Sequence, residues 1–109
     1  MPISKLLKPD FIKIMIIAEL AIFPTSEGIS VSKYVRRAIE IIEESGLKHE
    51  TGAMSTVIEA ENMDEIFEII KKTHDAMVEM GAKRIHIDLR IDHRLDKDAT
   101  IESKKRAVK

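Results

Sequence analysis

Residues 83–94 read KRIHIDLRIDHR, and this stretch alternates apolar and polar side chains more strictly than any other part of the chain. Its two faces hold four residues each, with Ile85, Ile87, Leu89 and Ile91 on one and His86, Asp88, Arg90 and Asp92 on the other. A period of two residues predicts a β-strand with one buried side. We expect its register to be fixed, because a slip by one residue would expose all four apolar side chains. The polar face is the first place to look for recognition.

The segment before residue 47 predicts a strand followed by a helix. Residues 16–23 are apolar apart from Glu19 and end at Pro24, as expected for a central strand covered on both faces. From residue 31 to residue 42 apolar side chains recur at helical spacing. Ser30 or Ser32 is suited to cap this helix, and Gly46 is suited to the left-handed position past its end.

Residues 47–61, LKHETGAMSTVIEAE, contain β-compatible residues on both sides of Gly52. They predict two strands joined by a tight hairpin near Gly52 and Ala53, or one long bulged strand. Asn62 and Glu65 then form a capping-box pattern that begins a second helix. The apolar stripe of that helix is Ile66, Phe67, Ile70, His74, Met77 and Val78. After residues 83–94, residues 100–108 predict a short basic helix capped by Thr100.

The order strand, helix, strand, strand, helix, strand predicts an α+β fold, the ferredoxin-like βαββαβ sandwich. One four-stranded antiparallel sheet carries both helices on one face, and a short C-terminal helix follows. We expect a single domain over residues 15–109, with residues 1–14 as an N-terminal extension and Met15 as an alternative start. On the other sheet face we expect Ile17, Ala21 and Phe23, which suggests association with a second copy.

Composition narrows the class of protein. The 109 residues carry a formal net charge of −1, which gives no general attraction to nucleic acid or to anionic membranes. The absence of cysteine excludes disulfides, thiolate metal sites and cysteine nucleophiles. No apolar run is long enough for a membrane span, so we expect a cytoplasmic protein. The charged share of 34%, rich in Glu and Lys, is typical of heat-adapted proteins.

Several activities of this fold class lack their residues here. The four histidines have no metal-ligand spacing, so we predict no metal site and no cofactor. RNA-recognition modules stack bases on aromatic side chains, but the third strand offers Met54, Thr56 and Ile58. Residues 24–28 contain neither an arginine nor a glycine cluster for a phosphate. With no nucleophile motif or paired acids, we expect no catalytic residues and no enzyme activity.

Five polar residues occupy strand positions where plain packing would prefer apolar ones: Glu19, Thr56, Glu59, Asp88 and Arg90. They have two interpretations. They line a ligand site, or they form cross-strand salt bridges and the rim of an oligomer interface.

Segments GAMSTVIEAE, DEIFEII and RIHIDLRIDHRLDK occur in an order and spacing that resemble the thiamine-binding-protein family of small ferredoxin-like proteins. The resemblance extends from Met15 to about Val108. It implies a ferredoxin-like fold and a homo-oligomer, either a dimer or a tetramer. It also implies binding of thiamine, or of its hydroxymethylpyrimidine moiety, without catalysis.

The chemistry of thiamine suits several of these residues. A carboxylate at Glu19, Glu59 or Asp88 would neutralise the thiazolium cation or accept from the exocyclic amine. Thr56 would bind the ring edge, while Met54 and Phe23 would pack against the rings. Tyr34, on the helix stripe, is better explained as a core residue.

Two features of this candidate set leave alternatives open. Thr56 and Glu59 are three residues apart, so a regular strand points them to opposite faces, and only a bulge or an interface brings them together. Arg90 suits a phosphate better than a cation, which fits phosphorylated thiamine or a salt bridge. The alternative to a binding protein is a structural or regulatory oligomer with no small-molecule ligand.

Overall fold

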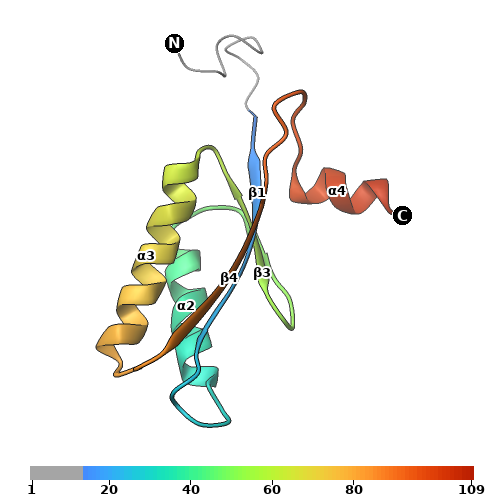
Figure 1. Ribbon diagram of the computed structural model, residues 1–109. Coiled ribbons are helices and arrows are strands. Elements are labelled where there is room, and N and C mark those ends of the chain that lie inside the picture. The colour runs from blue at the N-terminus through green and yellow to red at the C-terminus, as the bar shows by residue number, and fades with distance from the viewer. Residues whose placement is uncertain (1–13) are drawn as a thin grey trace.

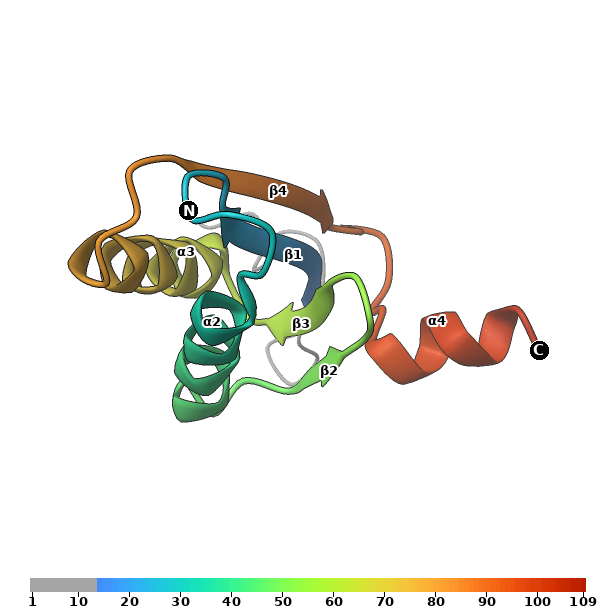
Figure 2. The same cartoon turned by 90° about the horizontal axis from the view of Figure 1, so that it is seen from below.

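The computed structural model describes residues 14–109, which form one sheet layer, one helix layer and a separate short helix (Figures 1 and 2). The described elements are β1 (Ile16–Pro24), α2 (Ser32–Glu44), β2 (His49–Thr51), β3 (Thr56–Ala60), α3 (Met63–Glu79), β4 (Ile85–Asp92) and α4 (Ile101–Ala107). The four strands pair in antiparallel fashion in the order β2-β3-β1-β4. The predicted ferredoxin-like fold is therefore confirmed. The predicted extension, residues 1–14, lies outside the described residues except for Ile14.

The register of β1 with its neighbours determines which side chains share a face. Glu19 lies opposite Val57 of β3 and Arg90 of β4, and the next residue, Leu20, lies opposite Thr56 and Leu89. Directly opposite residues point to the same side of a sheet. The helix-facing side therefore carries Leu20 and its partners, and the other side, here called the open face, carries Glu19 and its partners. The open face holds Ile17, Glu19, Ala21, Phe23, Glu50, Val57, Glu59, His86, Asp88, Arg90 and Asp92.

The core lies between the sheet and the helices α2 and α3, as Figure 2 shows. The side chains of α3 that it buries are Ile66, Ile69, Thr73 and Met77. Two residues predicted in that stripe, Phe67 and Val78, are exposed instead. Thr73 tolerates burial because its hydroxyl lies 2.9 Å from the carbonyl oxygen of Ile69 and bonds to it.

The helix ends agree only in part with the capping predictions. Asn62 caps α3 by accepting from the backbone N–H of Glu65 at 2.9 Å, and Thr100 caps α4 through a capping box with Ser103. Gly46 adopts the predicted left-handed conformation after α2, with φ of +76°. The predicted serine cap of α2 is wrong, because the capping position is Val31, which makes no side-chain cap.

Two strand predictions have different outcomes. Residues 47–61 form two strands with a hairpin, closed by a 2.8 Å bond from the N–H of Gly52 to the carbonyl oxygen of Ser55, and not one bulged strand. In β4 the predicted apolar face points to the helix layer, but Ile87 and Ile91 remain 39% and 36% exposed. The reason is that β4 is an edge strand, so it has a strand neighbour on one side only.

Helix α4 lies on the opposite side of the sheet from α2 and α3 (Figure 1). Its first residue, Ile101, is buried, whereas the residues after Ser103 are exposed. No helix within residues 14–109 is long and apolar enough to cross a membrane. The placement of α4 creates the main feature of the open face, which is described next.

Candidate ligand-binding groove

A groove of about 560 Å³ lies between the open face and α4. Its apolar lining residues come from three strands and from α4: Ile17, Val57, Ile91 and Ile101. Ile17 and Val57 point to the open face, whereas the side chain of Ile91 points to the helix layer. Its charged surface consists of Glu19, Glu50, Arg90, Asp92, Lys104 and Lys105. We call this cavity the open-face groove. Apolar walls with a few polar groups of defined position are typical of small-molecule sites.

Glu19 lies on β1, one of the two central strands of the sheet. Its Oε2 accepts a hydrogen bond from the hydroxyl of Ser55 at 2.7 Å. Its Oε1 lies 3.8 Å from Nη1 of Arg90, which is a long contact between exposed side chains. A pair of this kind is weak, since water screens both charges. Glu19 is therefore held in position by Ser55 while one of its oxygens remains open to a stronger donor.

Glu59 lies on the same face and has a different environment. It is only 6% exposed, and its Oε1 accepts from the backbone N–H of Ile101 at 2.5 Å. A buried carboxylate requires such a donor, because desolvation without a partner is costly. The structure thus uses Glu59 to attach the first turn of α4 to β3.

Two lysines of α4 reach acidic residues on the two outer strands. The ammonium group of Lys104 bonds to Asp92 of β4, and this bond lowers the pKa of the Asp92 carboxyl. The ammonium group of Lys105 lies 3.1 and 3.2 Å from the two carboxylate oxygens of Glu50 on β2. Sequence reasoning placed Asp92 on the polar face of its strand but missed Glu50, Lys104 and Lys105 as site components. The only signal for the lysines was the basic character of the predicted C-terminal helix, which did not reveal where that helix packs.

Asp88 and Phe23 lie toward the other end of the open face, away from α4. The carboxylate of Asp88 is 3.8 Å from Nε2 of His86, and the ring of His86 lies 5.2 Å from that of Phe23. Neither Asp88 nor His86 lines the open-face groove. Asp88 is thus separate from the acidic residues that do.

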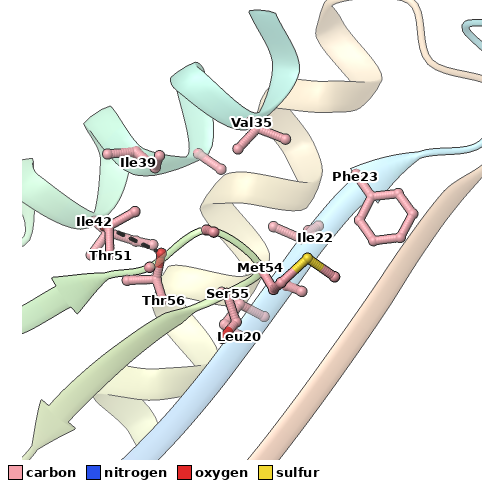
Figure 3. A pocket seen from close by; sticks show the side chains of 14 residues that line it. Leu20, Ile22, Phe23, Val35, Ile39, Ile42, Thr51, Met54, Ser55 and Thr56 are labelled. Carbon is pink, nitrogen blue, oxygen red and sulfur yellow. Dashed lines mark hydrogen bonds between the residues drawn. The ribbon is translucent and has the colours of Figure 1, made fainter. Parts of the chain in front are cut away.

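A second, smaller cavity of about 140 Å³ lies beside the β2–β3 turn, and we call it the hairpin pocket (Figure 3). Phe23, Met54 and Thr56 line it together with apolar residues of β1 and α2, among them Ile22 and Val35. Thr56 faces the helix layer, and its hydroxyl oxygen lies 3.3 Å from that of Thr51. Met54 is 88% exposed in the turn.

The sheet therefore divides the predicted site residues. Glu19 and Arg90 line the open-face groove, and Glu59 lies at its margin. Thr56 faces the opposite side of the sheet, so the expectation from a regular pleat holds and no bulge brings Thr56 and Glu59 together. Small-molecule sites usually have volumes of about 300–1,000 Å³. By this measure the open-face groove is large enough for a ligand, and the hairpin pocket is not.

The described part of the chain has no group of three or more His, Asp or Glu side chains placed to hold a metal ion. What the groove offers instead is an apolar surface with three acidic and three basic side chains around it. Its carboxylates suit a planar organic molecule that carries a positive charge or hydrogen-bond donors.

The fold and this groove define a class: small ferredoxin-like α+β proteins with one sheet face left uncovered by the two main helices. A family model described as thiamine-binding protein matches residues 18–109, and the chain belongs to this family.

Relatives and solved structures agree with this assignment. A UPF0045 protein of Methanocaldococcus jannaschii is 43% identical over 93 residues, which cover 85% of this chain and 91% of the relative. A crystal structure of a hypothetical protein from the same organism has a TM-score of 0.78 at 44% identity, covering 86% of this chain and 95% of the other. A Thermotoga maritima protein, named provisionally for thiamine biosynthesis or salvage, has a TM-score of 0.73 at 29% identity, covering 87% and 99%.

Proposed function

We propose that this protein binds thiamine, or its hydroxymethylpyrimidine moiety, in the open-face groove and catalyses no reaction. The observation that carries the proposal is the combination of a 560 Å³ groove with an apolar surface and carboxylates from several strands. Membership of the thiamine-binding-protein family supports the choice of ligand.

The ligand and the groove match in chemistry. Thiamine has a permanently cationic thiazolium ring and an aminopyrimidine ring with a donor amine. The flat rings would pack on Ile17 and Val57, where burial of apolar surface contributes about 25 cal/mol per Å². Glu19 would accept from the exocyclic amine or lie beside the cation, replacing its long contact with Arg90.

We also propose that the protein works as a homo-oligomer in the cytoplasm. Support for self-association comes from β4, an eight-residue edge strand on which Ile87 and Ile91 are exposed. A chain without cysteine suits a reducing compartment.

The test is titration calorimetry of the purified protein with thiamine, its phosphates and hydroxymethylpyrimidine. We expect saturable binding of one of them, and we expect Glu19→Gln to weaken it by about five- to tenfold, since hydrogen bonds to charged groups contribute about 1.5–3 kcal/mol and exposure reduces this. Glu43→Gln is the matched control. Glu43 lies on α2, and its side chain forms no hydrogen bond or ion pair within residues 14–109.

No saturable heat with any of the ligands would contradict the function. In that case an assembly that weakens with salt would favour the alternative, a structural oligomer in which the same charges form bridges. Equal affinity of wild type and Glu19→Gln would leave the function standing and contradict the assignment of the groove.

A further inference from the structure

We infer that two lysines of α4 compete with a cationic ligand: Lys104 and Lys105 occupy carboxylates that the ligand would otherwise use. This inference rests on the proposed function and deepens it, because it assigns two residues that set the charge preference of the groove.

The first observation is the reach of two lysine side chains of α4. Lys104 contacts Asp92 on β4, and Lys105 contacts Glu50 on β2. These strands are the two edges of the four-stranded sheet. The helix itself projects away from the sheet (Figures 1 and 2), so it is the side chains of two adjacent residues, not the body of the helix, that reach both edges.

The second observation is the balance of charge in the groove. Among the described residues that line it, Glu19, Glu50 and Asp92 are acidic, and three others are basic. Two of those three basic residues, Lys104 and Lys105, come from α4. An ammonium ion paired with a carboxylate is chemically similar to a ligand cation at the same carboxylate. Without α4, the groove would have an excess of negative charge.

The third observation is how weakly the lysines are held. All four side chains in the two ion pairs are between 42% and 54% exposed. Exposed pairs of this kind shift an equilibrium only by a factor of about two to five. The firm attachment of α4 is at its start, where Ile101 is buried and bonded to Glu59. The lysine-bearing end can therefore leave the sheet while the first turn stays in place.

These observations predict opposite effects on ligands of opposite charge. Thiamine, a cation, must displace the ammonium groups, so the lysines reduce its affinity. A phosphorylated form carries negative charge that the same ammonium groups would bind. Removing both lysines should therefore increase the preference for thiamine over thiamine diphosphate.

The experiment compares the double variant Lys104→Ala/Lys105→Ala with wild type by calorimetry, using thiamine and thiamine diphosphate. We expect thiamine to bind about fivefold more tightly to the variant, and thiamine diphosphate not to gain. The matched control is Arg106→Ala/Lys109→Ala, which also removes two positive charges. Neither Arg106 nor Lys109 lines the groove or forms an ion pair with another described residue.

A second readout is amide hydrogen exchange of residues 101–107 without ligand. It should become faster in the lysine variant and stay unchanged in the control, since only the former loses its contacts with the sheet. Circular dichroism checks that all variants are folded.

Each outcome has a distinct meaning. Thiamine binding to wild type with no gain in the lysine variant, or an equal gain in the control, overturns the competition by the lysines and leaves the proposed function intact. No binding of thiamine to any of the proteins overturns both. Binding to the lysine variant alone supports both.

Discussion

Tyr34 is a buried residue whose hydroxyl group is hydrogen-bonded within the protein. Its hydroxyl donates to Oε1 of Glu27 at 2.6 Å, and Ser26 donates to Oε2 of the same carboxylate at 2.9 Å. The oxygen of Ser26 accepts from the backbone N–H of Lys83 at 2.9 Å. The loop after β1 is thereby fixed to the loop before β4. Tyr34 is a core residue, as predicted.

This contact predicts a dependence of stability on pH. The hydrogen bond from Tyr34, followed by the one from Ser26, lowers the pKa of Glu27 below its ordinary value of 4.5. A carboxyl with a lowered pKa stabilises the fold above its ordinary pKa and loses that contribution as the pH falls through the folded value. The same bond raises the pKa of Tyr34, so the tyrosine contribution is complete at neutral pH and is lost only in alkali.

We predict that Tyr34→Phe lowers the free energy of unfolding at pH 7 and that the difference from wild type shrinks as the pH falls below about 4. Urea unfolding of both proteins at pH 7, 5 and 3 measures this. A difference that stays constant over the acidic range would show that the hydroxyl of Tyr34 contributes independently of the charge on Glu27, and would contradict this prediction.

At the residue scale, the sequence predicted which polar residues are unusual but not what they bind. Glu59 was expected at a ligand because a carboxylate is out of place in a strand. Its partner is the backbone N–H of Ile101, 42 residues later, and no local pattern reports such a contact. The side chains of Thr56 and Thr51 are hydrogen-bonded across a hairpin that the sequence predicts. The pairing of the two strands was therefore enough to predict this contact.

At the scale of elements, hydrophobic periodicity correctly predicted the direction in which the side chains of β4 point. It predicted poorly how deeply side chains are buried. The alternation in β4 assigned the correct side to Ile87 and Ile91, yet both remain partly exposed. On α3 the stripe included Phe67, which is exposed, and missed Thr73, which is buried. Spacing gives the direction of a side chain, whereas burial depends on which neighbour covers it.

The free edge of β4 leads to a prediction about assembly. An eight-residue edge strand with exposed isoleucines is a template for pairing with another copy. We predict that Ile87→Lys shifts the protein toward the monomer, because a charged side chain at such an edge opposes association. Light scattering coupled to size-exclusion chromatography measures the mass.

Ile29→Lys is the control for that experiment, since Ile29 is also an exposed isoleucine but lies in the loop before α2. We expect it to leave the mass unchanged. If wild type is itself monomeric at working concentration, or if both variants dissociate equally, the edge of β4 is not the interface.

At the scale of the whole molecule, the sheet separates two cavities that the sequence treated as one site. Strand order and fold class followed from the order of elements and from their capping and turn residues. The groove did not, because it exists only where the start of α4 meets the open face, and residues 93–100 carry no signal for that path. Lys104 and Lys105 could therefore be predicted as parts of a basic helix but not as parts of a site.

The separation of the cavities also makes the central claim directly testable. The open-face groove is lined by the methyl-bearing residues Ile17, Val57, Ile91 and Ile101. The hairpin pocket is lined by a different set: Ile22, Val35, Ile39 and Ile42. No isoleucine or valine is shared by the two cavities among the described residues.

The most direct measurement is a thiamine titration of isoleucine- and valine-methyl-labelled protein, followed by two-dimensional methyl NMR. We predict saturable shifts of the methyl signals of Ile17, Val57 and Ile101, while those of Val35 and Ile39 stay in place. Shifts confined to Val35, Ile39 and their neighbours would place the ligand in the hairpin pocket. That result, or a spectrum that thiamine leaves unchanged, would contradict the open-face groove as the thiamine site.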